Sequence, residues 1–292
     1  MNKITKIVIP VAGIGMRFLP WTKTMPKEML PIINRPLLDY IVDQAIDSGI
    51  ETIIFVSSTA KKPLDDYFDR NLDLEAQLSQ KGKLKELEEI KKISQKANFV
   101  FVRQGEQLGN GHALLQAKPI TANEPFVFCW GDELILSQPP IFKQLIDAYQ
   151  KYPGNYLALL KSIPGNHNIW CEKYGNAAGK ELEPGIIQVS KVIEKPGRGN
   201  SISDLFSVGG FIAEPEYIEA LSQSAPGKGG EIWWNSAFDK FIEKGKVFGK
   251  IIDGEYLDLG TPAGFVKANL YFALKNPEIF EEIKEYINLN KN

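Results

Sequence analysis

The sequence has few of the residues on which several common kinds of site depend. Its 292 residues include two cysteines, Cys129 and Cys171, which are too few for a disulfide framework or a zinc cluster. The two histidines, His112 and His167, stand far apart and give little support for histidine-based metal binding. Lys and Arg total 34 against 36 Asp and Glu, so the net charge of −2 gives no electrostatic reason to expect a nucleic-acid partner.

Long apolar runs are missing as well. No run approaches the roughly 18–20 apolar residues of a membrane-spanning helix, and residues 1–6 do not have the pattern of a signal peptide. We therefore expect a soluble, cytoplasmic protein without a membrane partner. The length, with 43% hydrophobic and 24% charged residues, suits one large domain or a domain with an extension.

The first half of the chain alternates strand-like and helix-like patterns. Residues 6–11 indicate a buried strand, residues 36–48 have the apolar spacing of a helix, and residues 51–58 indicate a second strand. Gly49 is a natural end for the helix. A strand, a helix and a strand at this spacing predict a βαβ unit and hence a parallel sheet. The same pattern predicts a strand at 97–105, a short helix at 111–117 and a strand at 125–130.

The pattern changes near residue 155, where no disordered linker marks a boundary. Strand-like segments separated by loops rich in Gly, Asn and Pro occupy residues 155–163, 185–196 and 204–214. Helical segments are expected near 215–222 and 232–244, a last strand at 246–254, and a helix in the second half of 255–274. In the first half, residues 72–95 predict an amphipathic helical insertion that takes no part in chemistry.

A loop of small residues follows the first strand at residues 12–15. In a doubly wound sheet, ligands bind beyond the carboxyl ends of the strands, and the backbone N–H groups of such a turn form a nest for anions. Arg17, Lys23 and Lys27 follow within a dozen residues and would strengthen anion binding, although Lys23 also suits a solvated surface position. The glycines alone leave open a phosphate site and a plain tight turn.

The loop fits neither of two common nucleotide-binding patterns. G-x-G-x-x-G would need a third glycine, and an NAD-binding dehydrogenase would need an acidic residue where Ser57 and Ser58 end the second strand. The Walker pattern would need Gly-Lys-Ser/Thr, which is also missing. A dehydrogenase is therefore the weaker interpretation of the loop.

The stretch "GIGMRFLPWTKTMPKEMLP" (residues 13–31) resembles the signature of the sugar-1-phosphate nucleotidylyltransferases. That signature is small-x-Gly-x-Arg-x-x-Pro followed by Pro-Lys-x-Met/Leu-Leu-Pro, and the form with Lys-Glu-Met-Leu-Pro is similar to the bacterial UTP–glucose-1-phosphate uridylyltransferases. The likeness covers about residues 5–275 in order. It extends through "RPLLDYIVDQAIDSGIETIIFVSS", "RQGEQLGNGHALLQA", Gly131–Asp132, Tyr174–Gly175 and "VIEKP" (192–196).

The resemblance implies transfer of a nucleotidyl group to a sugar 1-phosphate with release of pyrophosphate. The sugar phosphate is already an anion, so in-line attack on the α-phosphorus needs no general base. The protein must instead hold two polyanions together and neutralise charge at the α-phosphate, which calls for cations and Mg²⁺.

The likeness also assigns the cationic and nucleotide-binding residues. Arg17 would hold the β- and γ-phosphates, Lys27 would contact the phosphates and the attacking group, and Lys195 would pair with the sugar phosphate. Glu28 and Gln104 would face the edge of the base. The backbone would bind the nucleotide at Ala12, Gly13, Gly15 and Gly109. The alternatives are ordinary surface basic residues and, for residues 105–111, a solvent turn before a helix.

Metal and sugar ligands follow from the same likeness. Asp132 ends the strand at 125–130 and would bind Mg²⁺, with Asp258 as a second ligand; an ordinary turn residue is the alternative for Asp132. Asp258 lies in Asp-Leu-Gly-Thr, which is similar to the thymidylyltransferases, whereas the uridylyltransferases usually have Asp-x-Gly-Asp/Asn-Lys. The sugar would lie against Gly175, Glu194, Val208 and Gly209.

The match departs from the uridylyltransferases at "GGEIWWNSAF" (residues 229–238), where they usually have Gly-Gly-Glu-Ile-Gln-Leu-Thr-Asp. Trp233 and Trp234 suggest a repacked core or interface, which we favour, or stacking on a different sugar ring.

We predict a single domain, residues 1–292, with a Rossmann-like α/β fold: a mostly parallel twisted sheet flanked by helices. Residues of about 1–155 would form the nucleotide-binding half, and about 156–292 a β-rich sugar-binding half with C-terminal helices. The expected reaction is UTP with glucose 1-phosphate, giving UDP-glucose. Alternatives are dTTP, another sugar 1-phosphate, or a homologue that binds without turnover. We expect a homo-oligomer, a dimer or tetramer.

Overall fold

The centre of the first strand is apolar on both faces, so it requires cover on both of them. Ile7, Val8 and Ile9 are each fully buried. Because neighbouring side chains of a strand point to opposite faces, Ile7 and Ile9 enter one hydrophobic cluster and Val8 enters another. We describe the fold from a computed structural model, which describes residues 3–121, 123–163 and 165–289.

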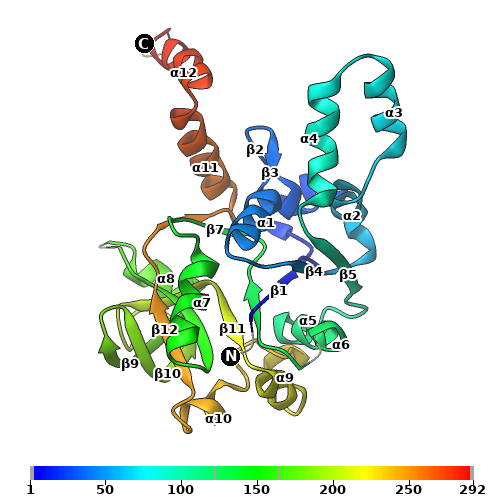
Figure 1. The fold of residues 1–292 in the computed structure, drawn as a ribbon. Helices are drawn as coiled ribbons and strands as arrows, with labels where there is room; N and C mark the ends of the chain where they lie inside the picture. The colour runs from blue at the N-terminus through cyan, green and yellow to red at the C-terminus, as the bar shows by residue number, and fades with distance from the viewer. Residues whose placement is uncertain (1–2, 122, 164, 290–292) are drawn as a thin grey trace.

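A nine-stranded sheet carries these two clusters on its opposite faces (Figure 1). Its strands, in spatial order, are β5 (Asn98–Arg103), β4 (Thr52–Ser57), β1 (Lys6–Pro10), β6 (Phe126–Cys129), β11 (Leu205–Ala213), β8 (Asn155–Lys161), β12 (Val247–Ile251), β10 (Ile186–Glu194) and β9 (Gly175–Glu183). Two small two-stranded sheets pair β13 (Glu255–Asp258) with β7 (Glu133–Leu136) and β2 (Pro31–Ile32) with β3 (Arg35–Pro36).

Helices complete both layers. They are α1 (Leu37–Asp47), α2 (Lys62–Phe68), α3 (Leu72–Gln80), α4 (Leu84–Gln95), α5 (Asn110–Gln116), α6 (Lys118–Thr121), α7 (Ile141–Lys151), α8 (His167–Lys173), α9 (Pro215–Ser222), α10 (Phe238–Ile242), α11 (Pro262–Lys275) and α12 (Pro277–Leu289). Short 3₁₀ turns lie at Met16–Phe18, Trp21–Lys23, Lys27–Met29, Thr59–Lys61 and Lys228–Gly230. Helices α1 and α7 pack on one face of the sheet, whereas α5, α9 and α10 supply the other cluster.

The parallel pairing is confined to particular neighbours. Strands β5, β4, β1 and β6 run parallel to one another, so their carboxyl ends meet at one edge. Strand β11 is antiparallel to both β6 and β8, and β10 is antiparallel to both β12 and β9. The expected α/β sheet flanked by helices is confirmed, with mixed pairing in its second half.

Most of the predicted elements are confirmed within a few residues. Elements that were not predicted include helices α2, α7 and α8 and strands β7, β9 and β13. The insertion at 72–95 is two helices, because Gly82 turns the chain with a φ of 67° between α3 and α4. The helix expected over 232–244 is wrong in its first half, since α10 begins at Phe238.

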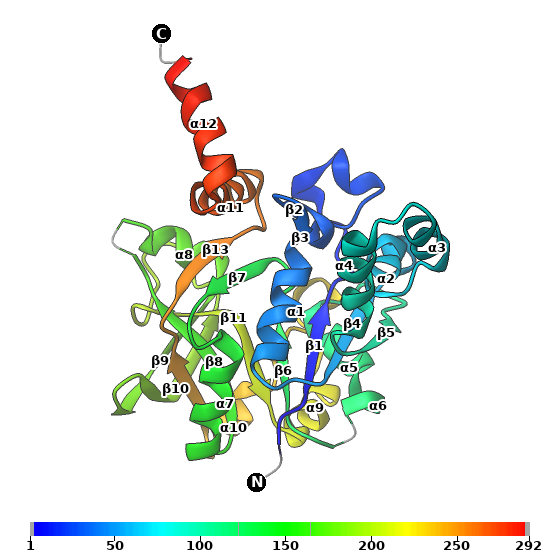
Figure 2. The same cartoon turned by 45° about the horizontal axis from the view of Figure 1, so that its top comes forward.

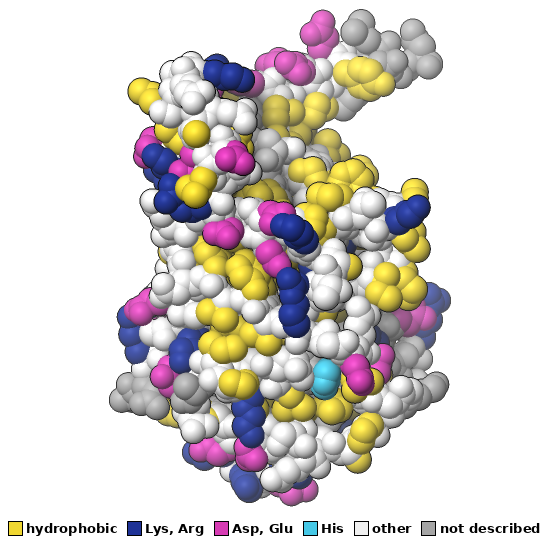
Figure 3. Space-filling model, turned by 90° about the vertical axis from the view of Figure 1, so that its right-hand side faces the viewer, with side chains coloured by type: hydrophobic (Ala, Val, Ile, Leu, Met, Phe, Trp, Pro, Cys, Tyr) yellow, Lys and Arg dark blue, Asp and Glu magenta, His cyan; other side chains and the backbone are white. Residues whose placement is uncertain are grey.

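Two helical segments project from the body of the molecule. In both Figure 1 and Figure 2 the α11–α12 arm extends away from the sheet, and in Figure 1 the α3–α4 hairpin projects from the body as well. The face in Figure 3 mixes Lys and Arg with Asp and Glu and has no broad field of one sign. Over residues 3–121, 123–163 and 165–289, no helix has both the length and the apolar character to cross a membrane.

An aromatic cluster in the second core should dominate the stability of the sheet. Phe211 on β11 is 1% exposed, and its ring lies within 6 Å of the rings of Phe128, Tyr217, Trp234 and Phe238. Phe211→Ala should lower the free energy of unfolding by about 3–5 kcal/mol, because it leaves a cavity where the sheet and helices meet.

Urea titration followed by circular dichroism checks this expectation. Leu72→Ala is the matched control, because Leu72 is 63% exposed and its truncation should change the free energy of unfolding by under about 0.5 kcal/mol. Equal effects of the two substitutions would contradict the assigned core.

Candidate active site

The loop after β1 leaves its backbone open. Gly13 is exposed, and no atom lies within 4 Å of the position that a Cβ would take there. Gly15 has a φ of 71°, and a Cβ there would lie 2.9 Å from Cγ2 of Thr22. The Thr22 hydroxyl donates to the Gly15 carbonyl at 2.8 Å, which fixes the turn. Such a turn presents N–H groups to a ligand without side chains in the way.

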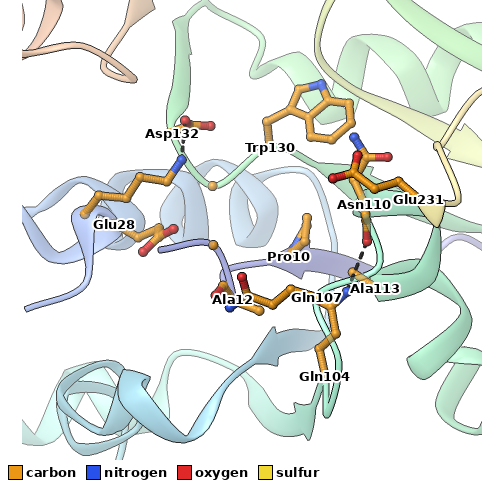
Figure 4. A pocket seen from close by; sticks show the side chains of 14 residues that line it. Pro10, Ala12, Glu28, Gln104, Gln107, Asn110, Ala113, Trp130, Asp132 and Glu231 are labelled. Carbon is orange, nitrogen blue, oxygen red and sulfur yellow. Dashed lines mark hydrogen bonds and ion pairs between the residues drawn. The ribbon is translucent and has the colours of Figure 1, made fainter. Parts of the chain in front are cut away.

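A cavity of about 320 Å³ opens beside this loop (Figure 4). Its walls come from the carboxyl ends of β1, β5 and β6 and from the start of α5. Of the residues expected to bind a nucleotide, it brings together Ala12, Gly13, Lys27, Glu28, Gln104, Gly109 and Asp132. Segments far apart in the sequence therefore converge on one hollow, as the parallel strands require.

Amide side chains fix one wall of this cavity. Nε2 of Gln104 donates to the carbonyl of Gly109 at 3.0 Å, and Nε2 of Gln107 donates to the carbonyl of Ala12 at 2.9 Å. Gly109 has a φ of 94°, and a Cβ there would lie 2.6 Å from the carbonyl oxygen of Ile232. A larger residue at 109 would therefore push the wall out of place.

Glu28 also borders the cavity, and only 1% of its surface is exposed. Its Oε2 atom lies 2.9 Å from Nζ of Lys61, which is itself 4% exposed. Burial raises the pKa of Glu28 above its ordinary value, although the charges of Lys61 and Lys27 act in the opposite direction.

Lys27 points from the 3₁₀ turn at Lys27–Met29 toward the end of β6. Its Nζ lies 2.6 Å from Oδ2 of Asp132. Burial lowers the pKa of Lys27, but the charges of Asp132 and Glu28 outweigh burial and leave the pKa raised overall. Lys27 is therefore charged throughout the physiological pH range.

Three of the expected site residues, Arg17, Asp132 and Asp258, lie around Gly260. A Cβ added to Gly260 would lie 3.1 Å from Oδ2 of Asp132 and 3.1 Å from Oδ1 of Asp258, so these oxygens are no more than about 6 Å apart. Nη1 of Arg17 would lie 3.7 Å from the same point, and it donates to the Gly260 carbonyl at 3.4 Å. The absence of a side chain leaves this space free for a ligand.

Asp258 already has partners on its other oxygen. Oδ2 accepts from Nζ of Lys173 at 2.8 Å and from the Tyr174 hydroxyl at 3.0 Å. Burial alone would raise the pKa of Asp258, but Lys173 outweighs it and lowers the pKa below its ordinary value. Asp258 is therefore a carboxylate at neutral pH, as a metal ligand must be.

The donor set fits a Mg²⁺ ion that is shared with phosphates. In the part of the chain that the structure describes, no three His, Cys, Asp or Glu side chains form a cluster that would hold a metal alone. Mg²⁺ is usually bound by one or two carboxylates, waters and substrate phosphates, and Asp132 and Asp258 supply such a pair.

A smaller cavity of about 160 Å³ lies beside the first, and Asn110, Trp130 and Asp132 border both. It brings together the expected residues Gly175, Glu194 and Lys195. Oε2 of Glu194 is buried without a hydrogen-bond partner, so it is an acceptor prepared for a ligand. Burial raises the pKa of Glu194, and Lys195 opposes that rise.

Val208 and Gly209 lie outside this small cavity, which Ser207 of the same strand borders instead. Val208 is fully buried in the first core cluster. A Cβ on Gly209 would lie 2.6 Å from Cδ1 of Ile141, in the core, and its N–H donates to Oε2 of Glu133 at 2.5 Å. The strand bulges between Ser207 and Phe211, which turns the two residues away from the position expected for them.

The two tryptophans have different surroundings. Trp234 is 2% exposed, packs against Phe211 and Phe238, and borders the small cavity, where a Cβ on Gly175 would lie 3.3 Å from its ring. The ring of Trp233 lies under Nζ of Lys195, at 5.6 Å from the ring centre. Trp234 therefore belongs to the core and at the same time bounds the cavity.

The family model described as "Nucleotidyl transferase" matches residues 6–274 of this chain. The chain belongs to the nucleotidyl transferase family. It is 38% identical to the UTP–glucose-1-phosphate uridylyltransferase of Staphylococcus epidermidis over 287 residues, which cover 98% of each chain. Uridylyltransferase 1 of Staphylococcus saprophyticus is also 38% identical, over 99% of this chain and 100% of that protein.

Solved structures agree with this placement in the nucleotidyl transferase family. The UTP-bound UGPase from Acinetobacter baumannii is 31% identical with a TM-score of 0.88, and the match covers 99% of this chain and 100% of that one. A UDP-glucose pyrophosphorylase complexed with UDP-glucose is 34% identical with a TM-score of 0.82, over 94% and 100% of the two chains. The predicted resemblance is confirmed.

Several polar residues of this transferase site were not predicted from the sequence. Gln107 donates a hydrogen bond to the carbonyl of Ala12. The ammonium groups of Lys61 and Lys173 donate hydrogen bonds to the carboxylates of Glu28 and Asp258, respectively. Asn110 borders both cavities and accepts the N–H of Trp234 at 2.8 Å. Of these residues, only Gln107 could have been assigned to the site from its neighbours in the sequence, because it follows Gln104 in the same glycine-rich turn.

Gly260 provides a test of the space between the two carboxylates. Gly260→Ala should raise the Mg²⁺ concentration for half-maximal activity by about tenfold or more, because its methyl group would lie 3.1 Å from Asp132 and Asp258. Calorimetric titration with Mg²⁺ in the presence of nucleotide should show the same weakening.

Gly105→Ala is the control for this substitution, because no atom lies within 4 Å of a Cβ added there. It should leave Mg²⁺ dependence unchanged. Unaltered Mg²⁺ affinity in Gly260→Ala would show that the metal lies elsewhere.

Proposed function

We propose that the chain is a Mg²⁺-dependent UTP–glucose-1-phosphate uridylyltransferase. It transfers the uridylyl group of UTP to glucose 1-phosphate and forms UDP-glucose and pyrophosphate. One observation carries the proposal: a nucleotide-sized cavity and a smaller cavity with an unpartnered carboxylate oxygen share the border residue Asp132. The names of the relatives, UTP–glucose-1-phosphate uridylyltransferase and UTP-bound UGPase, support the choice of substrates.

The nucleotide lies over the loop at residues 12–15, with its base toward Glu28 and Gln104. Arg17 and Lys27 hold the triphosphate, and each is positioned near the end of β6 by the contacts described above. In the free enzyme Lys27 neutralises Asp132, so both charges are satisfied before substrate arrives. Cations in this position stabilise the charge that develops on the departing pyrophosphate.

Glucose 1-phosphate occupies the smaller cavity. Glu194 accepts hydrogen bonds from sugar hydroxyls, Lys195 pairs with the sugar phosphate, and Gly175 leaves room for the ring. The backbone of Lys195 has a φ of 45°. Its Nζ atom lies 3.5 Å from Oε1 of Glu194, which keeps the ammonium group beside the cavity. The attacking phosphate oxygen then approaches the α-phosphorus beside Asp132, and the reaction needs no general base.

Asp132 and Asp258 would hold Mg²⁺, which would supply charge neutralisation at the α-phosphate. Three related possibilities remain as alternatives: dTTP, which the Asp258-Leu-Gly-Thr motif favours, another sugar 1-phosphate, and binding without turnover. The dimer or tetramer expected from the resemblance stays a prediction.

A panel of nucleoside triphosphates with glucose 1-phosphate and Mg²⁺ tests the reaction by pyrophosphate release. UTP should give the fastest release, and Asp132→Ala should lower kcat at least about a hundredfold while circular dichroism shows an intact fold. If neither UTP nor dTTP gave pyrophosphate, the proposed reaction would be wrong. Nucleotide binding by calorimetry without turnover would favour the alternative of a homologue that binds without catalysis.

Glu194 tests the sugar cavity. Glu194→Gln should raise KM for glucose 1-phosphate by about tenfold, because the amide replaces the unpartnered carboxylate acceptor, and should leave KM for UTP within about twofold. Glu181→Gln, on the exposed part of β9, is the control. A change in KM for UTP alone would place the sugar elsewhere.

A further inference from the structure

Lys61 is buried in a way that its position in the sequence does not explain. Among the lysines whose exposure the structure describes, it is the only buried one, with 4% of its surface exposed. It ends the 3₁₀ turn at Thr59–Lys61, directly after β4, and its Nζ lies 2.9 Å from Oε2 of Glu28. Burying two charges is costly, and an apolar pair of the same size is often at least as stable, so the pair calls for a reason other than stability.

The two partners face different spaces. Glu28 borders the nucleotide cavity, whereas Lys61 borders a neighbouring cavity of about 400 Å³. Ala12 and Gly13 lie between them and border both cavities. Lys61 therefore acts on the nucleotide cavity through Glu28 and not through a contact of its own. Lys27, next to Glu28 in the chain, is hydrogen-bonded to Asp132 instead.

We propose that Lys61 is a positioning residue for base selection, which holds Glu28 as a charged, acceptor-only group against the edge of the base. The inference rests on the proposed function, in which Glu28 faces the base. Uracil and thymine present a ring N–H donor at N3, whereas cytosine presents an acceptor there and adenine presents an acceptor at N1. A carboxylate accepts from the first two bases and repels the lone pairs of the others.

The alternative protonation state would lose this discrimination. A protonated Glu28 carries an O–H donor and can pair with N3 of cytosine. Burial raises the pKa of Glu28, and Lys61, followed by Lys27, works against that rise. Glu28 is charged above its pKa and neutral below it. Removal of Lys61 would raise this pKa further, so the loss of UTP binding on acidification would begin at a higher pH.

Lys61→Met and Lys61→Gln test the proposal through kcat and KM for UTP and CTP, measured from about pH 6 to about pH 9. Each should raise KM for UTP by about tenfold, lower the ratio of kcat/KM for UTP over CTP by at least about tenfold, and change kcat much less. The acidic limb of the UTP profile should move to higher pH. Lys61→Arg should recover most of the selectivity.

Lys62→Met is the matched control, because the Lys62 side chain is 75% exposed and pairs with Asp66 on the surface. It should leave selectivity and pH profile unchanged. Two substitutions at Lys61 are used because either one alone could fail to fold, and the amide of Lys61→Gln keeps a hydrogen-bond donor without the charge. Wild-type selectivity and an unshifted pH profile in the folded variant would overturn the proposal.

The double variant Glu28→Met, Lys61→Met separates this inference from the proposed function. Its neutral pair removes both the acceptor and the buried ammonium. Loss of UTP selectivity in the double variant with normal selectivity in Lys61→Met would refute the role of Lys61 alone. Normal selectivity in the double variant would show that Glu28 does not face the base, and would refute the base assignment as well.

Discussion

The site depends on the ion pair between Lys27 and Asp132. The pair joins a turn near the start of the chain to the end of β6, with Nζ and Oδ2 2.6 Å apart. Two polyanionic substrates repel each other, so a protein that brings them together needs cations there. A cation without a partner would be costly in the free protein, and Asp132 is that partner until substrate arrives. In the proposed function, the same carboxylate would then be a ligand of Mg²⁺.

Glycines keep space free between the charged groups of the site. Gly260 lies where a methyl group would come within 3.1 Å of both Asp132 and Asp258. In the loop at residues 12–15, Gly13 leaves the backbone open, since no atom lies within 4 Å of a Cβ added there. The arrangement is thus defined as much by absent side chains as by charged ones. A methyl group at Gly260 would occupy the space between the two carboxylates.

The sequence predicted the parallel half of the fold because its signals are local. Strand β6 and the centres of β1 and β4 are continuous apolar runs, and Gly49, with a φ of 87°, follows the end of α1. Helix α7 also has regular apolar spacing, although it was not among the predicted elements. Strand β9 carries a weaker signal, since residues 180–182 are charged or exposed at the sheet edge. The insertion of β11 between β6 and β8 is a long-range pairing that no local pattern encodes.

The site shows the same division between local and distant information. Arg17, Lys27 and Glu28 lie in one short motif, so a resemblance could assign them. Lys173 and Asp258 are 85 positions apart, and neither lies in a pattern that indicates the other. The resemblance placed Val208 and Gly209 near the sugar, but the strand bulges between Ser207 and Phe211, and both residues lie in the core.

Trp233 and Trp234, where the sequence departs from the usual uridylyltransferase pattern, link the two cavities through the core. The backbone N–H of Trp234 donates to Asn110, which borders both cavities, while its ring packs on Phe211 and bounds the smaller one. A change of sugar specificity at this wall would require repacking of an aromatic core, which is energetically costly. The smaller cavity is therefore rigid on the Trp234 side. In the proposed function, adaptation to another sugar would be easier on the exposed side of the cavity, where Lys195 lies over Trp233.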